Sequence, residues 1–232
     1  MKKISIVIPV KNEYKIILEN ISLIVNYLEN NFFQYEILVI ENGSTDNTIS
    51  ILQSISSLNQ NIKVYSLKKA MFGEAIRIGV TQSKYDIVFV SMDLAMGIDF
   101  IMDSYCMLSK YDFVNGSRYI KKDSIDRSFL RKSLSILNIK LSNLIFNCEF
   151  TDFDACKAFK NSVGKNLFTI SKSNHNFLLT EVLINLVKQG YSFCEIPVIH
   201  NEHRKSRFNI YKLILNHLQE LVLHKATLMF KK

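Results

Sequence analysis

Apolar and polar positions alternate along the first half of the chain in two different periods. Five short apolar runs predict β-strands, at residues 4–9, 35–41, 62–66, 86–91 and 113–115. The stretches between them repeat apolar residues every three or four positions and predict helices, at residues 14–30, 47–58, 73–83 and 99–109. The second run is apolar almost throughout, which is typical of a strand covered on both faces. The alternation predicts an α/β fold with a doubly wound, mostly parallel, Rossmann-like sheet flanked by helices.

The second half of the chain has a less regular pattern. It predicts helices at 130–147 and 181–189, a loop at about 168–177 and a strand at 193–198. Residues 209–230 have the spacing of an amphipathic helix. No clean boundary divides the chain, so we expect a single domain over residues 1–210 and a C-terminal amphipathic helix over 211–232. That helix either packs on the domain or lies in a membrane interface.

Composition narrows the class of protein. The chain has 232 residues, of which 48% are hydrophobic, enough for one α/β domain with a sizeable core. Its four cysteines are scattered and form no CxxC pair, which argues against a disulfide framework or a zinc site. No apolar stretch approaches the roughly 18 residues of a membrane span, so a soluble or peripheral protein is expected. The net charge of +8 favours anionic partners.

Polar loops follow the first two predicted strands. The first strand runs into Asn12 and Glu13, and the second runs into the sequence E-N-G-S-T-D at 41–46. The carboxyl ends of parallel strands share one edge of a sheet, where open α/β folds bind ligands, and helix N-termini there favour phosphate. The two loops therefore predict a nucleotide site. Each residue also has a structural interpretation, since Ser44 and Asp46 suit a helix cap and Glu13 suits the first turn of a helix.

Five motifs in order resemble those of the family 2 glycosyltransferases, which have the GT-A fold. The motifs are P-V-K-N-E at 9–13, E-N-G-S-T-D at 41–46, G-E-A-I-R-I-G at 73–79, G-S-R-Y at 116–119, and E-I-P-V at 195–198 followed by S-R at 206–207. Each is weak alone, but their order and spacing together are specific. The resemblance is strongest to the branch that contains the dolichyl-phosphate mannosyltransferases and the polyprenyl-phosphate glycosyltransferases.

This resemblance implies an inverting transfer from a nucleoside-diphosphate-sugar donor. Glu13, Glu41 and Asn42 would hold the base and ribose, and Arg77 would lie close to the diphosphate. The implied donor-binding residues are Pro9, Asn12, Glu13, Glu41, Asn42, Ser44, Asp46, Gly73, Arg77, Ser91 and Met92.

The metal motif of the family is altered in this chain. The resemblance implies that Asp93 is catalytic and binds Mg²⁺ or Mn²⁺ bridging the diphosphate. The first Asp of the family's D-x-D-x-Q stretch is replaced by Ser91, and its Gln by Ala95. Three outcomes follow from this change: the cation is held by Asp93 and substrate phosphates alone, metal dependence is weakened, or activity is lost.

The acceptor side is matched more loosely, by T-D-F-D-A-C-K at 151–157. Asp152 or Asp154 would occupy the carboxylate position and act as a general base toward a hydroxyl acceptor. A lipid phosphate would instead need basic residues, and Arg118 would join a cradle of Arg131, Arg204, Lys205, Ser206 and Arg207. The basic run could also be a solvated loop, and no interleaved aromatic residues support a nucleic-acid partner beyond the donor.

The sequence thus predicts an enzyme that glycosylates a polyprenyl phosphate as a peripheral protein at the cytoplasmic face of a membrane. The alternatives are transfer to a saccharide in cell-surface or envelope glycan synthesis, and a nucleotide-sugar-binding protein without turnover.

Overall fold

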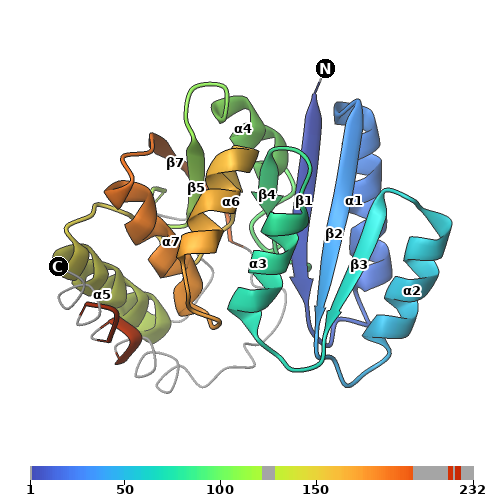
Figure 1. Ribbon diagram of the computed structural model, residues 1–232, viewed down its shortest axis with the longest axis horizontal. Coiled ribbons are helices and arrows are strands. Elements are labelled where there is room, and N and C mark those ends of the chain that lie inside the picture. Colours follow the sequence, from blue (N-terminus) through green and yellow to red (C-terminus); the bar gives the residue numbers. More distant parts are fainter. Residues whose placement is uncertain (1, 122–128, 201–218, 222, 226–232) are drawn as a thin grey trace.

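The computed structural model describes residues 2–121, 129–200, 219–221 and 223–225 (Figure 1). Most of the predicted C-terminal helix therefore lies outside the described residues. The part that is described is helical, and Leu221 is fully buried against Phe177 and Ile184. Among the residues with described positions, no helix combines the length and apolar character needed to span a bilayer.

Seven strands form one mixed sheet in the order β3-β2-β1-β4-β6-β5-β7. The strands are β1 Lys3–Val10, β2 Gln34–Asn42, β3 Ile62–Leu67, β4 Ile87–Phe89, β5 Phe113–Ser117, β6 Lys157–Phe159 and β7 Phe193–Pro197. β6 is antiparallel to both of its neighbours, and the other pairings are parallel. The predicted mostly parallel α/β sheet is confirmed.

The antiparallel strand β6 was not predicted from the sequence. It inserts between β4 and β5, so the doubly wound order stops at β4. β6 has only three residues and begins with a lysine, so neither its length nor its hydrophobicity signals a strand. The helix that follows it, α6 Asn161–Ile170, was also missed, and the loop predicted at 168–177 begins only after Ile170.

Helices cover both faces of the sheet (Figure 1). They are α1 Ile17–Asn31, α2 Thr48–Leu58, α3 Phe72–Gln82, α4 Phe100–Met107, α5 Phe129–Phe146, α6 Asn161–Ile170 and α7 Phe177–Lys188. Alternate residues of β1 point to opposite faces, so Ile6 packs in the cluster of α1, α2 and α4, whereas Val7 packs in that of α3, α6 and α7. This two-sided burial explains the continuous apolar runs of β1 and β2.

A glycine lets α3 lie close to the sheet. A Cβ atom on Gly79 would fall 2.3 Å from Val7 Cγ1 and 2.8 Å from Ile40 Cδ1. The side chains of β1 and β2 therefore occupy the space that any larger residue would need. This close contact fixes α3 against β1 and β2.

Candidate active site

A cavity of about 400 Å³ opens at the carboxyl ends of β1, β2 and β4. Its lining combines residues from these three strand ends with residues from α3 and from the segment before β6. They are Pro9, Val10, Lys11, Asn12, Glu13, Asn42, Phe72, Phe89, Ser91, Met92, Met96, Asp154 and Cys156. Six predicted donor residues line it (Pro9, Asn12, Glu13, Asn42, Ser91 and Met92). The cavity thus joins the predicted donor loops with a predicted acceptor residue.

The loops after β1 and β2 are bonded to each other. The backbone N–H of Asn12 donates to Ser44 Oγ at 2.9 Å, and the backbone N–H of Thr45 donates to Asn12 Oδ1 at 2.8 Å. Asn12 has a φ of +56°, a conformation that asparagine tolerates better than most residues. The backbone N–H of Glu13 donates to Thr48 Oγ1 at 2.9 Å. These bonds make one rigid wall from two loops.

Three predicted donor residues, Glu41, Ser44 and Asp46, do not line the cavity but stabilise this wall by hydrogen bonds. The buried carboxylate of Glu41 accepts a hydrogen bond from the backbone N–H of Ser44. Asp46 accepts hydrogen bonds from the hydroxyl and the backbone N–H of Thr48, the first residue of α2. Burial alone would raise the pKa of Asp46, but these hydrogen bonds outweigh it and lower that pKa. The helix-start interpretation therefore has direct support for Asp46, whereas the Ser44 hydroxyl bonds to the loop after β1.

Asn42 connects the cavity to the segment before α3. Its Oδ1 accepts a hydrogen bond of 2.7 Å from the backbone N–H of Met71. The next residue, Phe72, presents an aromatic side chain to the cavity.

Asp93 lies in a tight turn directly after the cavity residues Ser91 and Met92. Its Oδ1 accepts hydrogen bonds from Ser91 Oγ at 2.7 Å and from the backbone N–H of Ala95 at 3.2 Å. Within the described ranges, no group of three or more His, Cys, Asp or Glu side chains is placed to hold a metal ion. Mg²⁺ sites often use only one or two carboxylates together with substrate phosphates. The single carboxylate of Asp93 fits a site of this kind, in which substrate phosphates supply other ligands. It does not fit a site built from several protein carboxylates.

The two candidate acceptor-side carboxylates have different surroundings. Asp152 is buried and receives two hydrogen bonds from the Arg118 guanidinium, at 2.6 and 2.7 Å. Burial alone would raise the pKa of Asp152, but the charge and hydrogen bonds of Arg118 lower it. Asp154 is exposed and lines the cavity. Asp152 and Arg118 are thus committed to each other, whereas Asp154 faces the site.

Arg77 makes a set of contacts that differs from the one its motif implies. Its five N–H groups donate to Glu74, to Asn174 Oδ1 and to three backbone carbonyl oxygens, those of Phe168, Ser171 and Ser173. In this structure Arg77 therefore holds the 171–174 loop beside α3, and its role at the donor diphosphate stays a prediction from the motif.

Gly73 and Glu181 hold the same loop. A Cβ atom on Gly73 would fall 2.7 Å from the backbone carbon of Asn174. The buried Glu181 accepts hydrogen bonds from the backbone N–H groups of Lys172 and Ser173. Gly73 is therefore required by the close approach of this loop to α3.

The predicted phosphate cradle falls largely on residues that the structure does not describe. Arg204, Lys205, Ser206 and Arg207 lie outside the described residues, as does the side chain of Arg131.

Sequence reasoning also missed several cavity residues, among them Phe72, Phe89, Met96 and Cys156. The Cys156 thiol is neutral, because burial raises its pKa to about 12. No local sequence signal marks these residues, since they meet only through the fold.

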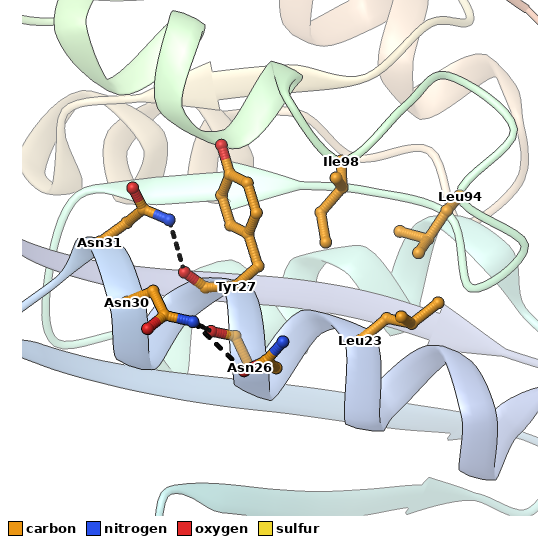
Figure 2. A pocket seen from close by; sticks show the side chains of 7 residues that line it. All are labelled: Leu23, Asn26, Tyr27, Asn30, Asn31, Leu94 and Ile98. Carbon is orange, nitrogen blue, oxygen red and sulfur yellow. Dashed lines mark hydrogen bonds between the residues drawn. The ribbon is translucent and has the colours of Figure 1, made fainter.

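A second cavity, of about 420 Å³, lies between α1 and the loop after β4 (Figure 2). Its seven lining residues are Leu23, Asn26, Tyr27, Asn30, Asn31, Leu94 and Ile98, none of them charged. The amide groups of Asn30 and Asn31 donate to carbonyls of their own helix, at 2.8 Å each. This cavity offers little to a charged nucleotide, whereas the strand-end cavity is lined by predicted donor residues and is therefore the candidate active site.

Comparison with known proteins agrees with this geometry. The model of the family described as Glycosyl transferase family 2 matches residues 5–168. The chain is 26% identical over 204 residues to Glycosyltransferase AglD of Haloferax volcanii, covering 84% of this chain and 32% of the relative. It is 27% identical over 225 residues to Dolichyl-phosphate beta-glucosyltransferase ALG5C of Trichomonas vaginalis, covering 90% of this chain and 66% of the relative. The chain therefore spans about a third of the first relative and slightly less than two thirds of the second.

Solved structures share the fold. The glucosyl-3-phosphoglycerate synthase of Mycobacterium tuberculosis in complex with UDP aligns with a TM-score of 0.71 at 16% identity, over 97% of this chain and 80% of that chain. Its complex with Mn²⁺ and UDP-glucose aligns with a TM-score of 0.70 at 17% identity, over 97% and 79% of the two chains.

Proposed function

The chain belongs to glycosyl transferase family 2, and from this premise we propose that it moves a sugar from a nucleoside diphosphate to a polyprenyl phosphate, with inversion at the anomeric carbon. One observation carries the proposal: three loops meet at one cavity. They contribute Asn12 and Glu13 after β1, Ser91 and Met92 after β4, and Asp154 before β6. The first two loops form the donor side, and the third faces them as the acceptor side.

The donor side suits a nucleotide. Asn12, Glu13 and Asn42 present amide and carboxylate groups to the cavity, and such groups hydrogen-bond a base or a ribose. Phe72 adds an aromatic side chain that can pack on a ring of the donor. The wall is pre-organised because the β1 and β2 loops are bonded to each other, so little ordering remains to oppose binding.

We assign the divalent cation to Asp93. When bound, Mg²⁺ or Mn²⁺ would supply positive charge to the diphosphate as it leaves the sugar. The Asp93 turn is held by Ser91 Oγ and the backbone N–H of Ala95, so the carboxylate is oriented before substrate arrives. Ser91 replaces a second carboxylate, so the affinity for metal should depend strongly on the donor phosphates.

Three considerations favour a lipid phosphate as the acceptor. Such an acceptor is already anionic and needs no base to attack the anomeric carbon. The chain has a net charge of +8, which favours an anionic substrate and an anionic membrane surface. One relative is named as a dolichyl-phosphate glucosyltransferase. We therefore propose a peripheral enzyme at the inner face of a membrane, acting in envelope glycan synthesis, with Arg131 and residues 204–207 as the phosphate cradle.

A saccharide acceptor is the second candidate, and the exposure of Asp154 favours it. A neutral hydroxyl needs a general base in the site, and Asp154 is the exposed carboxylate in the cavity lining of the acceptor side. Replacement of Asp154 separates the two enzymes. Asp154→Asn should abolish transfer to a hydroxyl and leave transfer to a phosphate largely intact.

The test is a transfer assay with purified protein. UDP- and GDP-sugars are supplied with and without Mn²⁺ or Mg²⁺, together with a short polyprenyl phosphate or an oligosaccharide. The proposal expects a metal-dependent prenyl-phosphate sugar of inverted anomeric configuration. Donor binding without product under every acceptor and metal would overturn it and favour a binding protein.

A further inference from the structure

The segment before β6 is held in place almost entirely by side chains. Residues 151–155, which we name the acceptor-side turn, precede β6 and include Asp154. Glu195 Oε2 accepts hydrogen bonds from the backbone N–H and the hydroxyl of Thr151, at 2.9 and 2.7 Å. Asn115 Nδ2 donates to the carbonyl oxygen of Asp152 at 2.6 Å. The start of the turn is thus anchored to β5 and β7.

The end of the turn is anchored by a buried lysine. Lys157 Nζ donates to the carbonyl oxygens of Phe153 and Ala155, at 2.9 and 3.0 Å. These two residues flank Asp154, so one ammonium group bridges the backbone on both sides of the residue that faces the cavity. The Lys157 side chain is fully buried, a placement that is costly for a charge unless it is paired.

The anchors form one row across the sheet. Asn115 of β5 is in register with Lys157 of β6 on one side and with Glu195 of β7 on the other. Asn115 Nδ2 also donates to Glu195 Oε1 at 2.7 Å. On its other side, Lys157 is in register with Phe89 of β4, which lines the cavity. The row therefore runs from the cavity wall to the far strand of the sheet.

We infer that Lys157, Asn115 and Glu195 form a positioning row that fixes the acceptor-side turn against the cavity. The inference rests on the proposed function, in which Asp154 borders the acceptor. It holds for either acceptor, because displacement of the turn would move the wall against which a phosphate or a hydroxyl must be oriented. Lys157 is a positioning residue, since it acts through the turn and not on the reacting atoms.

The row also predicts a pH dependence. Four groups act on Lys157: Asp152 and Asp154 from the turn, Cys156 directly before β6 and Arg118 directly after β5. Burial outweighs the attraction of the carboxylates and lowers the pKa of Lys157 to about 8. Above that pH the group becomes a neutral amine, which is a weaker donor to the two carbonyls. Acceptor use should therefore decline on the alkaline side of pH 8.

The experiment compares Lys157→Met with Lys160→Met. Lys160 is the matched control, a half-exposed lysine three residues later that pairs with Asp112 at 2.9 Å. We expect Lys157→Met to lower kcat/KM for the acceptor by about a hundredfold, the loss that an ångström of misplacement produces. The KM for the donor should stay unchanged, and amide hydrogen exchange should accelerate in residues 151–155. Lys157→Arg, which stays charged, should restore acceptor use and extend it above pH 8.

Two results would overturn the inference: unchanged acceptor kinetics, or unchanged exchange of the turn, in folded Lys157→Met. If that variant does not fold, Glu195→Gln answers the same question, because it weakens the anchor of Thr151 with little change of shape. If the wild-type protein transfers no sugar, the proposed function fails. The exchange measurement then still decides whether the row holds the turn.

Discussion

Arg118 and Asp152 form a bidentate ion pair inside the protein. Arg118 Nε and Nη2 lie 2.6 and 2.7 Å from the two carboxylate oxygens, and the side chains are only 4% and 1% exposed. The pair joins the end of β5 to the segment before β6, two elements that are 34 residues apart in sequence. Charge pairing offsets the desolvation of both groups, so the loss of one partner would leave a buried charge uncompensated.

The first prediction concerns this pair. Asp152→Asn removes the negative charge and leaves the Arg118 guanidinium buried without its counter-ion. We expect the free energy of unfolding to fall by about 3–5 kcal/mol, the usual loss when a buried pair is broken. Urea denaturation at neutral pH measures this change.

The half-exposed pair of Lys160 and Asp112 provides the control. Their side chains are 39% and 27% exposed, so solvent screens the interaction. Lys160→Met should therefore cost no more than about 1 kcal/mol. Equal losses in the two variants would show that burial does not strengthen the dependence on Arg118.

The second prediction is that the folded protein loses stability at acid pH. In the folded protein the pKa values of Asp152, Asp112 and Glu36 are lowered. Burial alone would raise them, but hydrogen bonds and cationic partners have the larger effect. The stabilisation is complete above the unfolded values, about 3.9 for Asp and 4.3 for Glu, and is lost as the pH falls through the folded values. The free energy of unfolding should therefore decline below about pH 4. In Asp152→Asn that decline should be shallower, and denaturation curves from pH 7 to pH 3 compare the two proteins.

Much of the fold could be predicted from the sequence because the local signals agree with the tertiary structure. β1 and β2 are apolar because they are buried on both faces, and their observed ends lie within a residue of the predicted ones. β6 could not be predicted, because three residues beginning with Lys157 carry no periodicity. Its position depends on pairing with β4 and β5 on either side.

The candidate site could likewise be predicted only in part. Asn12, Glu13 and Asn42 line the cavity because the strand-end position follows directly from parallel topology. The hydrogen-bond partners of a side chain could not be predicted in this way. Arg77 bonds to a loop more than 90 residues away, and Asp152 pairs with Arg118. A motif supplies the residue type, but the fold decides which groups it meets.

The third prediction tests Arg77. The structure commits its N–H groups to the 171–174 loop, so Arg77→Ala should free the loop and accelerate amide exchange in residues 171–174. Affinity for UDP should change little. Arg77→Lys cannot make five hydrogen bonds and should restore only part of the protection.

The family motif places Arg77 beside the diphosphate, and that interpretation predicts the opposite result. Removing a charged contact to a phosphate would weaken UDP binding by roughly tenfold or more, at about 1.5–3 kcal/mol for such a hydrogen bond. Calorimetry of UDP binding to wild type and Arg77→Ala distinguishes the two. A large loss of affinity with an undisturbed loop would favour the motif.

The last prediction restores the missing carboxylate of the metal motif. In Ser91→Asp, the new side chain would replace a hydroxyl that donates to Asp93 at 2.7 Å, so two carboxylates would repel each other without a cation. We expect the metal-free variant to be less stable than wild type and the Mn²⁺–UDP form to recover, because a second carboxylate strengthens a site for a hard cation. The half-saturating concentration of Mn²⁺ should fall about tenfold if the second ligand adds about 1.4 kcal/mol. Thermal unfolding with and without Mn²⁺ and UDP measures both effects, and Ser91→Asn, which is close in size but neutral, is the control. Equal responses of the two variants to Mn²⁺ would mean that position 91 does not face the metal.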